Sequence, residues 1–174
     1  PDIVHGKVAE VAFARSNKLD MIITHDGNLY TRNPMSVGDI YGFPINETSD
    51  GQRFDVAPYF GHRSGASGGG SVIIYDNTNK RFMVLDDDNK NIPRVLTFTG
   101  GTVDFQAETG RNMVYMDWTK DNYTFAVLED PVDGEMYVYG IGVGNNGINE
   151  RKYYMKLNRP NTDKITNVAF HLYY

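Results

Sequence analysis

The chain has 174 residues, a formal net charge of −5 at pH 7 and 40% apolar residues, so it can bury one substantial core and is not an intrinsically disordered segment. Its basic residues are scattered rather than arranged in a stripe that could neutralise phosphates, so nucleic acid is not an expected partner. Cysteine is absent and no apolar run reaches the roughly 20 residues of a membrane-spanning helix, so we expect no disulfide, thiolate metal site or transmembrane segment.

Short apolar runs bounded by Gly, Asn and Asp recur along the chain, which indicates an all-β fold. The run Val11-Ala12-Phe13 precedes a predicted hairpin over residues 21–31. The turn of this hairpin, His25-Asp26-Gly27-Asn28, contains residue types that tolerate left-handed backbone conformations. The sequence therefore predicts a first unit made of a strand and a hairpin.

The second unit begins with a predicted strand over residues 54–60. A glycine-rich stretch follows at residues 64–70; it has no trailing Lys-Ser/Thr and opens a strand, so it is interpreted as a surface loop rather than a phosphate cradle. The clearest hairpin of the chain is predicted over residues 71–85, with Asp76-Asn77-Thr78-Asn79 as its turn.

The third unit has a predicted strand over residues 113–118 and a predicted hairpin over residues 123–141. The turn of this hairpin ends on Asp133-Gly134, in which glycine supplies a positive φ. A further strand is predicted over residues 151–157, so the third unit contains four strands. The last predicted strand, residues 165–170, starts another unit.

The three hairpins recur at a steady interval. The middle of the outgoing strand falls at Ile23, Ile74 and Val127, which are 51 and 53 residues apart. Val11-Ala12-Phe13 also reappears as Val168-Ala169-Phe170, 157 residues later, which is three steps of about 52. Four strands in about 50 residues is the size of a propeller blade.

We therefore expect an all-β, β-propeller-like domain of about three four-stranded blades plus the start of a fourth, with an antiparallel β-sandwich as the alternative. The expected blades cover approximately residues 8–45, 54–105 and 113–157, and the fourth begins at residue 165. Because propellers normally close with at least four blades, we expect further blades or a second chain to complete the fold.

The sequence contains no recognisable catalytic or metal-binding motif. Its four histidines are far apart, and none has a second ligand at the spacing of a local metal clip. Asp86-Asp87-Asp88-Asn89 resembles the start of a calcium loop, but Lys90 and Asn91 stand where that loop needs a ligand and a glycine. We predict no catalytic residue, no metal site and no cofactor.

Aromatic residues of the third unit are the candidate binding residues. Trp118, Tyr115 and Tyr153, with Tyr154 next to them, could stack on sugar rings, because aromatic rings offer a large flat contact area. The competing interpretation, favoured by their alternation along predicted strands, is packing between neighbouring blades.

Three stretches carry a family resemblance: Asp26-Gly27-Asn28-Leu29-Tyr30, the hairpin from Ile73-Ile74-Tyr75-Asp76 to Arg81-Phe82, and residues 165–174. Together they resemble the C-terminal propeller-like region of PKD-like family surface lipoproteins of Bacteroidetes. The resemblance implies an extracytoplasmic location, in the periplasm or at the outer-membrane surface, and a link to glycan or nutrient uptake. It supplies no catalytic residues.

Two classes of function remain open. The lack of a catalytic motif favours a non-catalytic binding or scaffolding module, with a carbohydrate or a protein as its partner, over an enzyme. The alternative is a propeller-type glycan hydrolase or lyase, which would gather carboxylates or histidines at the central channel.

Overall fold

The computed structural model describes residues 6–13, 20–32, 45–48, 51–56, 60–64, 70–86, 93–96, 109–118, 123–143 and 149–158. Within these ranges the chain forms β-strands, turns and connecting segments, and no helix, which confirms the all-β prediction. None of the described segments forms an apolar helix of membrane-spanning length.

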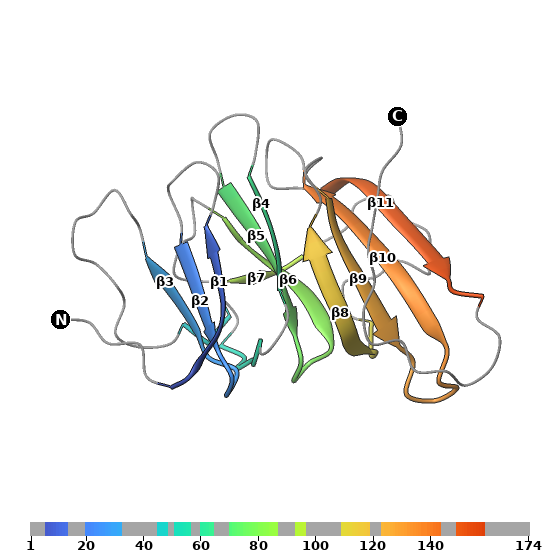
Figure 1. Ribbon diagram of the computed structural model, residues 1–174, viewed down its shortest axis with the longest axis horizontal. Coiled ribbons are helices and arrows are strands. Elements are labelled where there is room, and N and C mark those ends of the chain that lie inside the picture. Colours follow the sequence, from blue (N-terminus) through green and yellow to red (C-terminus); the bar gives the residue numbers. More distant parts are fainter. Residues whose placement is uncertain are drawn as a thin grey trace.

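The strands form three separate antiparallel sheets, and neighbouring strands in each sheet follow one another along the chain (Figure 1). Sheet 1 consists of β1 (Val8–Phe13), β2 (Asp20–Thr24) and β3 (Leu29–Arg32). Sheet 2 consists of β4 (Phe60–Ser64), β5 (Gly70–Asp76), β6 (Arg81–Asp86) and the short β7 (Arg94–Val95). Sheet 3 consists of β8 (Asn112–Trp118), β9 (Tyr123–Glu129), β10 (Met136–Val143) and β11 (Asn149–Lys156).

The three predicted hairpins are confirmed as β2–β3, β5–β6 and β9–β10. In each sheet the hairpin supplies the second and third strands in chain order. β8 and β11 confirm the strands predicted over residues 113–118 and 151–157. The predicted loop over residues 64–70 is flanked by paired strands, because Ser64 ends β4 opposite Gly70 at the start of β5; residues 65–69 lie outside the described residues.

Each hairpin turn contains one residue with a positive φ. These residues are Gly27 (φ 89), Lys80 (φ 53) and Gly134 (φ 72), spaced 53 and 54 residues apart. At Gly27 a side chain is disfavoured for two reasons. The positive φ strains any residue other than glycine, and a Cβ atom there would lie 2.7 Å from the Cβ of Asp55. The turns thus repeat the interval that the hairpin strands follow in the sequence.

One backbone hydrogen bond also recurs in all three sheets, two residues after the positive-φ position. The N–H groups of Ile45, Leu96 and Leu157 donate to the carbonyl oxygens of Leu29, Phe82 and Met136, at 2.8, 3.0 and 2.8 Å respectively. Ile45 therefore takes the same place beside β3 that Leu96, just after β7, takes beside β6. Sheet 1 shares this feature with the two four-stranded sheets.

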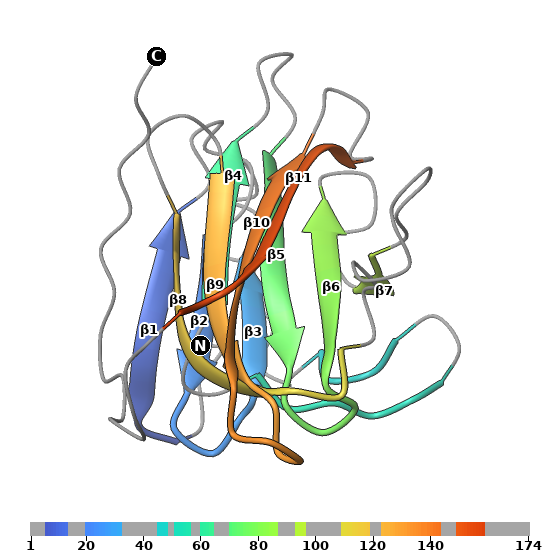
Figure 2. The same ribbon diagram turned by 90° about the vertical axis from the view of Figure 1, so that its right-hand side faces the viewer.

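The sheets stand side by side in a row, with sheet 2 in the middle (Figure 1), and their strands run in broadly similar directions (Figure 2). One apolar core lies between sheets 1 and 2, and a second lies between sheets 2 and 3. The first contains Ile23, Leu29, Phe54, Val56, Ile74, Met83 and Leu85. The second contains Ile73, Tyr75, Phe82, Val84, Leu96, Met116, Ala126, Leu128, Tyr139 and Ile141. The described sheets thus form three layers rather than the two of a sandwich, and they do not close into a ring.

Burial on both faces explains the composition of sheet 2. Successive side chains of a strand point to opposite faces, so Ile73 and Tyr75 enter the core against sheet 3 while Ile74 enters the core against sheet 1. A strand covered on both sides needs a continuous apolar run rather than alternation. Each large side chain that is fully removed from water stabilises the fold by roughly 1.5–3 kcal/mol.

The strand predicted over residues 54–60 is wrong over its first half. Residues 54–56 are not in a strand, and β4 starts only at Phe60; residues 57–59 lie outside the described residues. Phe54 and Val56 are apolar because they are buried in the core between sheets 1 and 2. A buried connecting segment therefore shows the same alternation of apolar residues as a half-buried strand, which is why the sequence pattern predicted a strand here. The strand predicted over residues 165–170 lies outside the described residues.

Candidate functional site

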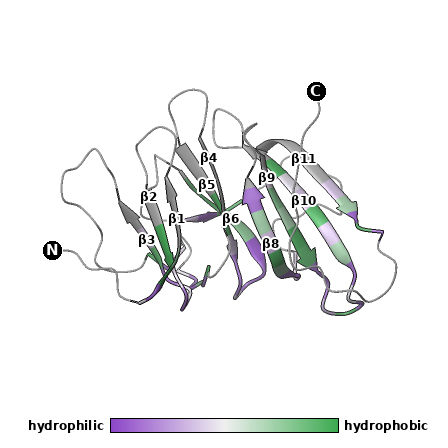
Figure 3. Ribbon diagram, viewed as in Figure 1, coloured by the Kyte–Doolittle hydropathy of each residue, from purple (hydrophilic) through white to green (hydrophobic). Residues whose placement is uncertain are grey.

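Hydrophilic residues gather at the hairpin turns, whereas the coloured parts of strands such as β2 and β9 are largely hydrophobic (Figure 3). Among the described residues no group of three His, Cys, Asp or Glu side chains could hold a metal ion. Among the described residues, a dense network of polar and aromatic side chains surrounds Arg111, just before β8. We call it the Arg111–tyrosine cluster; it consists of Arg111, Asp130, Tyr137, Tyr139 and Tyr154.

The Arg111 guanidinium contacts all four other members of the cluster. Its Nε donates to Asp130 Oδ2 at 3.1 Å, and its Nη1 donates to the hydroxyl groups of Tyr154, at 3.0 Å, and Tyr139. Its central carbon lies 3.6 Å from the centre of the Tyr137 ring, which is a cation–π contact. The cluster is partly open to water, since the side chains of Arg111 and Asp130 are 17% and 22% exposed.

Strand geometry brings the three tyrosines together. Tyr137 and Tyr139 are two residues apart in β10 and so share a face, and Tyr154 of β11 is the direct partner of Tyr139. The Tyr137 and Tyr154 rings are nearly parallel, with centres 5.6 Å apart and an angle of 11°. The Tyr139 and Tyr154 rings meet edge to face at 5.0 Å. Tyr137 and Tyr154 are half-buried, whereas Tyr139 is buried.

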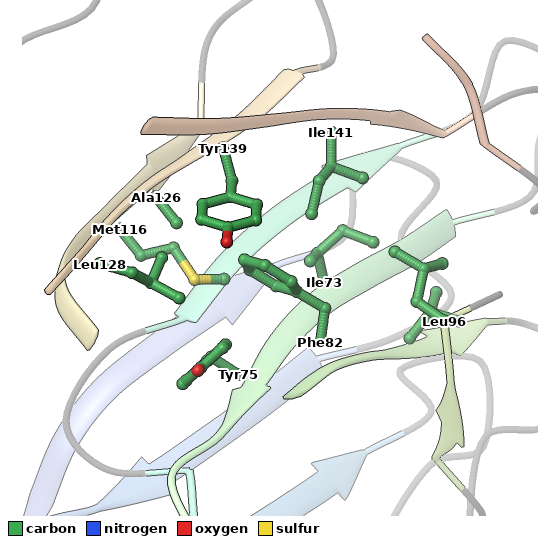
Figure 4. Packing of buried hydrophobic residues seen from close by; sticks show 10 residues of the cluster. Ile73, Tyr75, Phe82, Leu96, Met116, Ala126, Leu128, Tyr139 and Ile141 are labelled. Atoms are coloured by element: carbon green, nitrogen blue, oxygen red, sulfur yellow. The ribbon is translucent and has the colours of Figure 1, made fainter. Parts of the chain in front are cut away.

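The cluster is tied to sheet 2 as well as to sheet 3. The Tyr75 hydroxyl of β5 donates to the Arg111 carbonyl and lies 2.6 Å from the Thr109 hydroxyl. The rings of Tyr75 and Tyr139 both pack on Phe82, with centres 5.0 and 5.5 Å away (Figure 4). Arg111 is therefore positioned by contacts with two sheets.

The surroundings of these groups shift their ionisation. Burial raises the pKa of Tyr139 to about 12, although the Arg111 charge opposes the shift. Burial also raises the pKa of Tyr75. The N–H of Val132 holds the pKa of Asp130 below its usual value, and Arg111 adds to this effect. At neutral pH the cluster thus holds an uncharged Tyr139 beside the Arg111–Asp130 ion pair, an arrangement suited to hydrogen bonding.

A second ion pair has a local role in the β5–β6 turn. Arg81 Nε donates to Asp76 Oδ2 at 3.1 Å, and both side chains are buried. Asp76 Oδ1 also accepts the backbone N–H groups of Thr78 and Asn79, at 3.0 and 3.1 Å. Asp76 therefore organises the turn, as a carboxylate at the start of an Asx-type turn does.

The predicted binding residues are not assembled into one site by the described contacts. Tyr115 is half-buried, pairs with Val127 and donates its hydroxyl to Asp117 at 3.2 Å. Trp118 ends β8, and Tyr153 lies in β11; the side chains of both are outside the described part of the structure. Tyr154 is the one aromatic of that prediction that belongs to the Arg111–tyrosine cluster.

Sequence reasoning missed Arg111, Tyr137 and Tyr139. The signal that could have found the tyrosines is their Tyr-x-Tyr alternation on the return strand of the third hairpin. Among the other candidates, His25 is exposed in the first turn, and Asp86 ends β6, while residues 87–89 lie outside the described ranges. No protein-family model matches the chain, and no curated protein matches it.

Proposed function

We propose that this chain is a non-catalytic recognition module on a β-propeller-like scaffold, and that its ligand is a glycan. Two ion pairs among the described residues support this proposal most directly. The Asp76–Arg81 pair orders a turn, and the Arg111–Asp130 pair anchors the segment that enters sheet 3. A hydrolase or lyase would direct such groups at a substrate.

The propeller-like scaffold is supported by the repetition within the three sheets. Sheets 2 and 3 are four-stranded antiparallel meanders, the form of a propeller blade. All three sheets share the positive-φ turn position and the hydrogen bond that follows it. Large apolar side chains fill the space between successive sheets, as stacked blades require.

The Arg111–tyrosine cluster is the proposed ligand-binding surface. Tyr137 and Tyr154 offer half-buried aromatic rings, and sugar rings pack their apolar faces on such rings while neighbouring polar groups accept or donate hydrogen bonds. The resemblance to PKD-like family surface lipoproteins supports an extracytoplasmic place of action and a link to glycan uptake.

A glycan array probed with the purified chain tests the proposal, with variants compared at equal folded content by circular dichroism. Loss of a stacking ring worth about 1.4 kcal/mol weakens binding about tenfold, so we expect this effect from Tyr137→Ala and a much smaller one from Tyr137→Phe. Val132→Ala is the matched control, because Val132 is 94% exposed in the adjacent β9–β10 turn. Array signals that Tyr137→Ala leaves unchanged, or release of reducing ends from any glycan, would contradict the proposal.

A further inference from the structure

Sheet 3 has a second apolar face, on the side away from sheet 2. Phe125, Val127, Met136 and Val138 form a cluster there, and none is more than 4% exposed. Every described residue of this cluster, including the half-buried Val114, belongs to sheet 3 or directly follows it, as Leu157 does. A face this apolar requires a covering segment, and the links between the sheets indicate which one.

The two links between sheets follow one geometric rule. The carbonyl of the positive-φ turn residue accepts a backbone N–H from the segment that leads into the next sheet. Gly27 accepts from Val56 at 3.1 Å, and Lys80 accepts from Thr109 at 2.8 Å. In both links the donor lies 29 residues after the acceptor (27 to 56 and 80 to 109), and the next strand starts four or three residues later.

Applied to sheet 3, the rule selects a particular stretch of the C-terminal segment. The positive-φ residue of its hairpin is Gly134, and the residue 29 positions later is Asp163. The next strand should then begin at residue 166 or 167, three or four residues after Asp163. Independently, Val168-Ala169-Phe170 repeats Val11-Ala12-Phe13, the last three residues of β1. A geometric interval and a sequence repeat therefore indicate the same stretch.

We propose that the outer face of sheet 3 is the docking surface for residues 163–170 of the same chain. The Asp163 N–H donates to the Gly134 carbonyl, and residues 165–170 form the first strand of a fourth sheet, in which Val168 and Phe170 share one apolar face. Residues 159–174 lie outside the described residues. The inference rests on the repeat that also underlies the proposed scaffold, but not on glycan recognition.

Disulfide trapping in the full chain tests this register, since the chain has no cysteine of its own. The test pair is Gly134→Cys with Asp163→Cys; a Cβ at Gly134 would meet no atom of the described residues within 4 Å. Lys80→Cys with Thr109→Cys is the positive control, because that backbone contact is observed. Lys80→Cys with Asp163→Cys is the matched negative control, because Lys80 is the equivalent turn position of the wrong sheet.

We expect mild oxidation to close the test pair within one chain to the same extent as the positive control, while the negative control stays reduced. A test pair that stays reduced while the positive control closes would overturn the proposal, as would closure only between two chains, which would make a second copy the occupant. As a second measurement, Phe170→Asp should bind several-fold more of a dye for exposed apolar surface than Asn161→Asp does. Equal dye binding by the two variants would also contradict the proposal. Neither readout depends on a glycan, so this proposal and the proposed function can fail separately.

Discussion

Replacing Arg111 by alanine should destabilise sheet 3 more than the loss of an exposed charge on that sheet does, because all four side-chain partners of Arg111 lie in sheet 3 or its hairpin turn. The side chain donates three hydrogen bonds, to Asp130, Tyr139 and Tyr154, and stacks on Tyr137. Hydrogen bonds from a charged donor are each worth about 1.5–3 kcal/mol, and a cation–π contact about 0.5–2 kcal/mol. Because the site is partly solvated and the terms are not additive, we expect a loss of about 2–4 kcal/mol in the free energy of unfolding.

Urea unfolding followed by circular dichroism measures this loss. Arg111→Lys should fall between the wild type and Arg111→Ala, because lysine keeps the charge but lacks the planar fork that reaches two hydroxyls and a carboxylate. Lys156→Ala is the control: Lys156 lies 3.6 Å from Glu135 in a largely exposed pair, which is worth less than about 1 kcal/mol. If Arg111→Ala unfolds within about 0.5 kcal/mol of the wild type, as the control should, the cluster does not stabilise sheet 3 and our reasoning is wrong.

Three further predictions concern the turns and the ionisable groups. Gly27→Ala should lower the free energy of unfolding in urea by about 1 kcal/mol more than Gly134→Ala does. Both positions have a positive φ, but only at Gly27 would the new Cβ lie 2.7 Å from another side chain, so equal losses would contradict the prediction. The pKa of Tyr139 is raised from 10.0 to about 12, so its contribution to stability is complete below pH 10 and is lost as the pH rises towards 12. The free energy of unfolding measured across that range should therefore depend less on pH in Tyr139→Phe than in the wild type. The pKa of Asp130 is lowered from 3.8, so its contribution to stability is present above that pH and is lost as the pH falls through the folded-state pKa. Asp130→Asn should therefore flatten the acid limb of the stability curve below pH 3.8, and an unchanged acid limb would refute the assignment.

The hairpins were predictable because each is specified locally. An apolar run, a turn of Asn, Asp or Gly and a second apolar run lie within about 20 residues, and the turn residues select the register. The repeat interval was also readable, and the positive-φ positions at Gly27 and Gly134 fall on glycines that the sequence displays. Lys80 takes the same conformation without glycine, so composition gave no sign of it.

The candidate site was less predictable because its members are distant in sequence. Arg111 meets Tyr139 and Tyr154 only when β10 and β11 pair, and it meets Tyr75 only when sheets 2 and 3 stack. Nothing in the residues around Arg111 indicates those partners. The same limit explains the wrong half of the strand predicted over residues 54–60, since a buried link and a strand show the same local alternation.

The sequence by itself determined that the chain is all-β, where its hairpins turn and that they recur about every 52 residues, because side-chain period and turn chemistry act over a few neighbouring residues. Only the tertiary structure decided which face of each sheet meets which neighbour. It placed Asn46 so that its side chain donates to the carbonyls of Gly27 and Phe54, at 2.7 and 2.9 Å, joining two segments that no local pattern connects. Such contacts depend on how three sheets stack, and stacking follows from the sum of many buried side chains rather than from any one stretch of sequence.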